Sequence, residues 1–171
     1  MIQISPTPAV GIVQSNVLKS FTVANTTGSI VLWRLTGIVL VKKLYGIVET
    51  TPLSANITAA HFRLNDQTAT YDITLAAGTA LSAAVVGRMI SKRALVATAL
   101  EASGGLTNIG AVLEPSVTLA DPFSPFVLIK KTAANTDIEF RYTTTDNPST
   151  GAMRFFIEYQ PMSFDGLLAP Q

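Results

Sequence analysis

The amino-acid sequence predicts an all-β fold, a jelly-roll-like β-sandwich, and two observations predict it. Residues 138–142 alternate strictly between apolar and charged side chains, and in residues 153–159 every second side chain is apolar. A period of two marks strands that bury one face. Shorter runs rich in Val, Ile, Leu and aromatic residues recur along the chain with turn-forming residues between them, a spacing typical of sandwiches and jelly rolls.

The first residues predict an extended arm that precedes the first strand. Pro6 and Pro8 each lack a backbone N–H and bias the preceding residue towards extended conformations. We therefore expect residues 1–14 to form an N-terminal arm outside the sandwich. Residues 20–23 predict a short first strand, which is followed by turn-forming Asn, Thr and Gly.

Two longer strands are expected next, at residues 30–35 and 38–48. Both runs are rich in Val, Ile and Leu, and they contain the only Trp and one Tyr, the enrichment that favours strands. Gly37 and Gly46 indicate a bend, a bulge or a close approach of neighbouring backbone.

The middle of the chain gives a mixed signal. Residues 59–64 and 71–75 alternate between two faces and predict half-buried strands. The alanine-rich residues 80–86 leave open one short helix, which Gly87 would terminate. Residues 91–101 stay open between helix and strand.

The last third predicts four strands, at residues 109–113, 126–130, 138–142 and 153–159. The final two are expected to form a hairpin at the heart of the sandwich, because the residues between them, 143–151, are rich in Thr, Asn, Pro and Gly. The sandwich domain is thus expected to span residues 15–164, and residues 165–171 to form a C-terminal tail.

Charged residues are few for a globular domain. They make up 13% of the chain, against about 25% in an ordinary domain, and 48% of residues are hydrophobic. Because charged side chains keep a monomer's surface solvated, we expect other protein to cover part of this surface. The scattered basic pairs and the net charge of +1 argue against nucleic-acid binding. The charged residues Arg34, Lys42 and Lys43 interrupt the most apolar stretch, which argues against a membrane span.

The residues that usually carry catalysis or bind metal are scarce. The chain has no cysteine and one histidine, His61, which is too few for a zinc site. Asp66 and Asp72 flank a turn and are the best candidates for a calcium site, but they lack the spacing of a calcium loop. We therefore predict no catalytic, cofactor or metal site, a non-enzymatic protein, and no hydrolytic activity dependent on His61.

Three segments near the C-terminus carry a resemblance to a known class. They are GAVLEP at residues 110–115, DIEFRYTTT at 137–145 and GAMRFFIEYQPM at 151–162. Together with GIV at 46–48, this succession of strands resembles the endings of small virion proteins of tailed bacteriophages. The resemblance implies a head decoration or cement protein, made in the host cytoplasm, that binds the major capsid protein on the outer surface of the head and stabilises it. It also implies a homo-oligomer, most simply a trimer.

Two other functions stay open from the sequence. One is a tail, neck or fibre-base component of a virion. The other is a carbohydrate-binding β module, which exposed aromatic side chains would favour, an exposed Trp33 above all. For assembly, we predict that both terminal segments contact neighbouring subunits, through the apolar residues Ile2, Ile4, Pro6, Pro8, Val10, Leu167 and Leu168.

Overall fold

The computed structural model describes residues 11–20, 28–49, 57–74, 81, 84–92, 101–102, 125–131, 133–144 and 151–171. The described residues form antiparallel strands and contain no helix. The predicted strand at 109–113 lies outside the described residues, as does most of the one at 20–23. The all-β class predicted from the alternating pattern is therefore confirmed.

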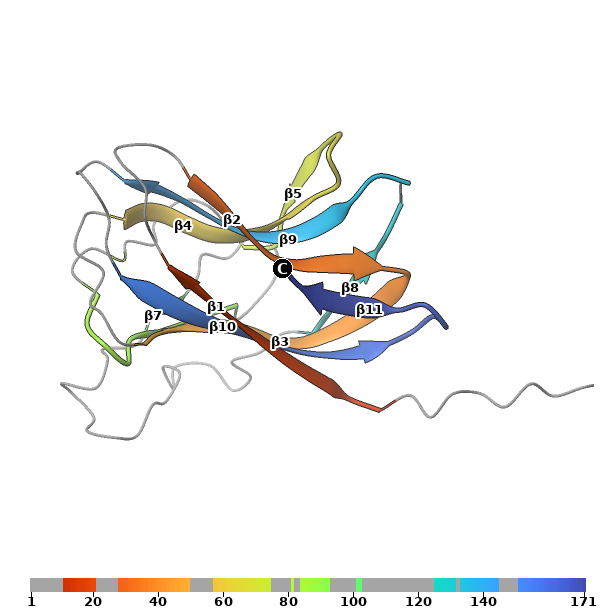
Figure 1. Ribbon diagram of the computed structural model, residues 1–171, viewed down its shortest axis with the longest axis horizontal. Coiled ribbons are helices and arrows are strands. Elements are labelled where there is room, and N and C mark those ends of the chain that lie inside the picture. The colour runs from red at the N-terminus through yellow and green to blue at the C-terminus, as the bar shows by residue number, and fades with distance from the viewer. Residues whose placement is uncertain are drawn as a thin grey trace, which may run out of the picture.

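The strands are β1 (Val13–Ser20), β2 (Gly28–Thr36), β3 (Ile38–Val48), β4 (Ile57–Asn65), β5 (Thr70–Asp72), β6 (Met89–Ser91), β7 (Glu101–Ala102), β8 (Phe126–Ile129), β9 (Thr136–Thr144), β10 (Ala152–Pro161) and β11 (Leu167–Pro170). One sheet has the order β1-β10-β3-β6-β7, and β8 also pairs with β3. The other has the order β11-β2-β9-β4-β5. Figure 1 shows the two sheets as layers, with β2, β4 and β9 above and β1, β3 and β10 below.

The path of the chain between the sheets is that of a jelly roll. Strands β1 and β3 lie in one sheet, whereas β2, β4 and β5 lie in the other. The chain then returns to the first sheet for β6 to β8, and crosses again for β9 and again for β10. Strands β8 and β6 share one edge of β3, since β8 pairs with its first half and β6 with its second. The first sheet therefore has the order β1-β10-β3, with β8 and β6 together in the position of a fourth strand. It packs on the second sheet, β2-β9-β4-β5, to which β11 is added beside β2. Two packed four-stranded sheets connected in this way form the jelly roll.

The core lies between the two sheets and is built from the alternating residues of each strand. Phe155 of β10 packs against Phe140 of β9 with ring centroids 5.0 Å apart, and against Phe62 of β4 at 6.1 Å. Trp33, Tyr142 and Tyr159 are also fully buried. Because strand side chains point alternately to opposite faces, the apolar half of each strand accounts for this core.

The expected hairpin between residues 138–142 and 153–159 is wrong. Both segments are strands, within β9 and β10, but β9 pairs with β2 and β4 while β10 pairs with β1 and β3. The two strands face one another across the core, as the Phe140–Phe155 contact shows. Alternation reveals which face of a strand is buried and says nothing about its pairing partner, so two alternating segments near in sequence need not pair in one sheet.

The expected boundaries at the two ends also need correction. Strand β1 begins at Val13, inside the segment assigned to the arm, and all eight of its residues pair with β10. The segment 165–171, expected to be a tail, contributes β11, which pairs with β2 from Thr36 to Trp33. A four-residue strand is too short to show a period in sequence, and its partner lies more than 130 residues away.

No helix forms in the described part of residues 80–86, which are Leu81 and 84–86. The backbone N–H of Ala84 donates to the carbonyl of Leu81, and that of Arg88 donates to the carbonyl of Val85. These are turns that lead into β6. Gly87 has a positive φ of 84°, as expected for a residue that ends a turn rather than a helix.

Both glycines singled out from the sequence stand where other backbone or side chains come close. Gly37 joins β2 to β3 with φ of 57°, and a Cβ there would meet the side chains of Ser163 and Asp165. Gly46 lies under the ring of Phe155, so a Cβ would stand 2.9 Å from that ring. The expectation of a bend or a close approach is confirmed at both positions.

We expect Gly37→Ala to lower the free energy of unfolding by about 1–2 kcal/mol, the cost of a left-handed backbone in a residue with a Cβ. Urea denaturation measures this change. Gly11→Ala is the control, since no heavy atom of the described residues lies within 4 Å of a Cβ at that position. Equal stability of the two variants would contradict the expectation.

Candidate interaction surface

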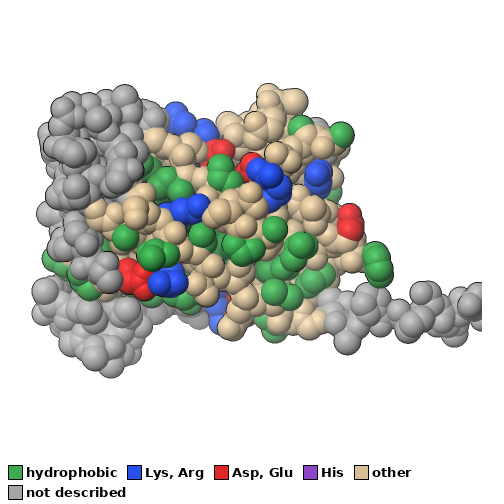
Figure 2. Space-filling view, in the orientation of Figure 1, with side chains coloured by type: hydrophobic (Ala, Val, Ile, Leu, Met, Phe, Trp, Pro, Cys, Tyr) green, Lys and Arg blue, Asp and Glu red, His purple; other side chains and the backbone are tan. Residues whose placement is uncertain are grey.

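Exposed apolar side chains form two groups towards the end of the sandwich where β10 turns into β11. Tyr71, Val127 and Ile129 line a groove, and Met162, Phe164 and Leu167 lie on the β10–β11 turn and at the first residue of β11. Ile38 connects the two parts of this surface, because it pairs with Ile129 and its carbonyl accepts from the backbone of Met162. Figure 2 shows hydrophobic side chains exposed at the right-hand edge of the molecule, where Figure 1 draws the β10–β11 turn. Because large contiguous apolar patches mark interaction sites, this end of the sandwich is the candidate interaction surface.

Phe164 is the most exposed of these side chains, at 95%, and it stands on a turn that is tightly held. The Ser163 hydroxyl accepts from the backbone N–H of Ile38 at 2.8 Å and donates to the Asp165 carboxylate at 2.8 Å. The Thr36 hydroxyl donates to the carbonyl of Asp165 at 2.7 Å. The fold therefore fixes the backbone under Phe164 while leaving its ring in solvent.

A groove of about 400 Å³ opens at the same end of the sandwich, between β4–β5 of one sheet and β8 of the other. Leu64, Ile73 and Leu128 form part of its apolar lining, and Tyr71 and Val127 form part of its rim. The lining residues are Leu64, Asp66, Tyr71, Asp72, Ile73, Phe126, Val127, Leu128, Ile129, Lys131 and Thr136. This groove is the mouth of the sandwich, where the short strands β5 and β8 leave the core partly open.

Polar groups of three kinds line the same groove. The Lys131 ammonium lies 5.6 Å from the centroid of the Tyr71 ring, a cation–π distance. Asp72 is half exposed. The hydroxyl of Thr136 is buried and has no hydrogen-bond partner in the described part of the chain. The groove thus combines apolar walls with three charged residues, the exposed Lys131 and Asp72 and the buried Asp66.

The interface residues predicted from the sequence are only partly placed here. Ile2, Ile4, Pro6, Pro8 and Val10 lie outside the described residues. Leu167 is exposed and belongs to the apolar end, whereas Leu168 is 1% exposed and lies in the core. The assignment of Leu168 to an interface is wrong, because β11 turns alternate side chains inward.

Sequence reasoning missed Phe164 and the groove residues Tyr71, Val127 and Ile129 as a surface. Phe164 stands two residues after Met162 in a stretch with Pro, Ser, Asp and Gly. A large aromatic residue between turn-forming residues is the signal that would have found it. The groove has no such signal, since its walls come from strands about 55 residues apart in the sequence.

His61 points to the outer face of β4, as expected, but it is only 6% exposed. Its Nδ1 lies 2.8 Å from the carbonyl of Ala59 and its Nε2 lies 3.6 Å from the carboxylate of Asp72. Because a carbonyl only accepts, the short contact places a proton on Nδ1. A β-bulge at residues 59–60, where Ala59 has φ of 50°, turns the ring back onto the strand.

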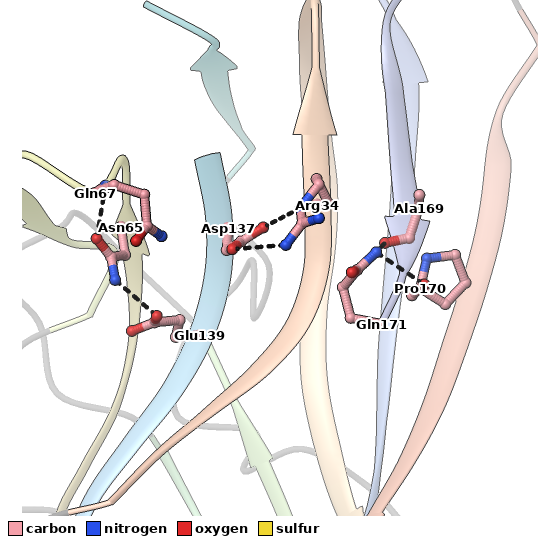
Figure 3. Close-up of polar contacts among 8 residues, drawn as sticks. All are labelled: Arg34, Asn65, Gln67, Asp137, Glu139, Ala169, Pro170 and Gln171. Carbon is pink, nitrogen blue, oxygen red and sulfur yellow. Dashed lines mark hydrogen bonds and ion pairs between the residues drawn. The ribbon is translucent and has the colours of Figure 1, made fainter. Parts of the chain in front are cut away.

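The acidic residues of β9 lie in a polar network on the outer face of the five-stranded sheet. The Glu139 carboxylate accepts from the Ser29 hydroxyl at 2.6 Å, from Arg63 at 2.7 Å and from the Asn65 amide at 2.8 Å. Asp137 forms a two-pronged pair with Arg34 at 2.9 and 3.3 Å. Figure 3 shows Asp137 and Glu139 side by side on β9, with Arg34 on one side and Asn65 on the other. These contacts join β2, β9 and β4, so they hold the sheet together.

Asp66 organises the turn between β4 and β5. Its Oδ1 accepts from the hydroxyl and backbone N–H of Thr68 at 2.7 and 3.0 Å and from the N–H of Ala69 at 2.7 Å. These bonds, the Thr68 hydroxyl first, lower the pKa of Asp66. Within the described ranges, no three His, Cys, Asp or Glu side chains come together as metal ligands, and Asp66 serves as a turn residue.

Most of the aromatic residues considered for sugar stacking are in the core. Trp33 is fully buried and its Nε1 donates to the Ser15 hydroxyl at 3.0 Å. Tyr45 is partly exposed and stacks on Phe156 with ring centroids 4.9 Å apart. The burial of Trp33 removes the feature that would have favoured a carbohydrate-binding module most, whereas Tyr71 is exposed at the rim of the groove.

Comparisons of this chain with family models, with curated proteins and with solved structures find no match. Among the described residues, no helix is long and apolar enough to cross a membrane.

Proposed function

We propose that this chain is a non-enzymatic structural protein of a bacteriophage virion, a decoration or cement protein that assembles on the outer surface of the head. The observation that carries the assembly role is the apolar end of the sandwich, with Phe164 held in solvent by a braced turn. A fixed, exposed aromatic side chain supports a role at an interface, because aromatic anchors that become buried dominate binding energy.

The virion location rests on two further supports. The jelly roll is an architecture of viral capsid domains, although it also serves lectins and cupins, so the fold alone does not establish function. The resemblance of residues 137–145 and 151–162 to the endings of small phage virion proteins favours the capsid among these. The low charge of the chain, 13% of residues, agrees with a surface that other subunits cover.

Labelling of intact particles tests this proposal. Antibodies raised against the purified protein should decorate the heads of the phage that encodes it in electron micrographs, and the protein should sediment with heads that lack it. Labelled tails or necks would replace the head role with that of a tail, neck or fibre-base component. Particles without label, together with protein that fails to sediment with heads, would defeat the virion role.

A further inference from the structure

We propose that Phe164 of one copy of this chain inserts into the groove between β4–β5 and β8 of a second copy, and that this contact drives self-association. The inference rests on the proposed function, since it names the surface through which copies assemble. The inference concerns contacts between copies of this chain and not contacts with the capsid, so an experiment can contradict the inference without contradicting the proposed function, and the reverse.

Phe164 is built as an anchor. Phe164 is 95% exposed, yet the backbone around it is fixed. The N–H of Gly166 donates to the carbonyl of Ser163, and the N–H of Met162 donates to the carbonyl of Ile38. Gly166 is also enclosed, because a Cβ there would meet the Ile38 carbonyl at 2.5 Å. An anchor on a rigid turn loses little conformational freedom on binding, so more of its burial appears as affinity.

The groove fits this anchor in shape and in charge. Its walls are apolar and its volume of about 400 Å³ exceeds that of a phenyl ring. Phe164 is followed by the exposed Asp165, and the groove carries exposed Lys131 at its mouth. The lining also carries two carboxylates: Asp72 lies 3.6 Å from His61, and Asp66 is buried and holds the β4–β5 turn. An inserted ring would therefore bring Asp165 towards Lys131, an arrangement of opposite charges that fixes orientation.

The positions of the anchor and the groove suit assembly of identical copies. Both lie at the same end of the sandwich, joined through Ile38, which pairs with Ile129 and receives the turn's backbone hydrogen bonds. When two or three copies meet at this end around an axis, each Phe164 reaches the groove of a neighbour. Every copy then uses one anchor and one groove, as a closed symmetric assembly requires.

Three variants and one control test the contact by analytical ultracentrifugation across the micromolar range. Phe164→Ser removes the anchor, and Val127→Glu puts a charge on the groove's rim at an exposed position. Each should raise the dissociation constant for self-association roughly thirtyfold or more, the loss expected for an anchor residue. Lys131→Gln should raise it less, because Lys131 acts at the rim. Leu18→Ser is the control, since Leu18 is exposed on β1 opposite Arg154, and it should associate as wild type does.

A mixture separates insertion into the groove from other contacts. Phe164→Ser keeps an intact groove and Val127→Glu keeps an intact anchor, so the two variants mixed should associate more tightly than either alone. Circular dichroism and thermal unfolding should match wild type for both, because each side chain is exposed. Wild-type protein that stays monomeric, unchanged association of Phe164→Ser, unchanged association of Val127→Glu, or no recovery on mixing would each overturn the inference.

The same variants keep this inference distinct from the proposed function. If Phe164→Ser lost self-association but still sedimented with phage heads, the decoration role and the inference would both stand. If wild-type protein associated through this contact but did not sediment with phage heads, the decoration role would fail while the inference held.

Discussion

Replacing Phe155 with alanine is expected to lower the free energy of unfolding by about 3–5 kcal/mol. Phe155 is fully buried and its ring contacts Phe140 and Phe62, which belong to the opposite sheet. Its loss would leave a cavity between the two layers and remove their central contact. Because the interior is close-packed, neighbouring side chains fill such a cavity only partly.

The adjacent residue provides the matched control. Phe156 is on the same strand but points to the outer face, where it stacks on Tyr45 and is partly exposed. We expect Phe156→Ala to cost about 0.5–1.5 kcal/mol, the value of an aromatic pair. Urea denaturation of both variants measures the difference. Equal losses of stability would contradict the assignment of Phe155 to the buried face of β10 and of Phe156 to its outer face.

Replacing Glu139 with glutamine is expected to cost about 3 kcal/mol of stability. The lost charge leaves Arg63, which is itself largely buried, without its carboxylate partner, and breaking a buried ion pair typically costs about 3–5 kcal/mol. We expect the lower end of this energy range because water still reaches part of the Arg63 side chain. Glu158→Gln is the control, since its partner Lys43 is well exposed, and surface pairs contribute about 0–1 kcal/mol.

The stability supplied by Glu139 should also depend on pH. Burial, the largest single effect, raises the pKa of Glu139, but the hydrogen bonds from Ser29, Asn65 and Arg63 and the charge of Arg63 outweigh it and leave the pKa lowered. A lowered folded-state pKa means that the contribution is complete above the unfolded value of about 4.3 and is lost as pH falls below it. The stability difference between wild type and Glu139→Gln should therefore shrink in acid. A difference that stays constant down to the folded-state pKa would contradict the role of this carboxylate.

Local sequence patterns determined the strands and the class of the fold. The alternation in residues 138–142 and 153–159 placed two central strands with their buried faces, and Gly37 and Gly46 marked close approaches that the structure contains. Such features depend on side-chain period and backbone freedom, which neighbouring residues decide. The expected limits of the sandwich, residues 15 and 164, are wrong at both ends. Strands β1 and β11 are held by partners that are distant in the sequence, so no local pattern marks them.

The tertiary structure alone decided which strands pair and which apolar side chains stay outside. Residues 138–142 and 153–159 have the pattern of a hairpin, yet they lie in different sheets. Leu167 and Leu168 are the same residue type in adjacent positions, and only the pairing of β11 with β2 buries the second. Phe164 is apolar and yet stays exposed. The groove forms where β4 and β5 lie close to β8, which is far from both in the sequence. The partner of a strand depends on contacts across the whole chain, and a local period shows only which face of the strand is buried.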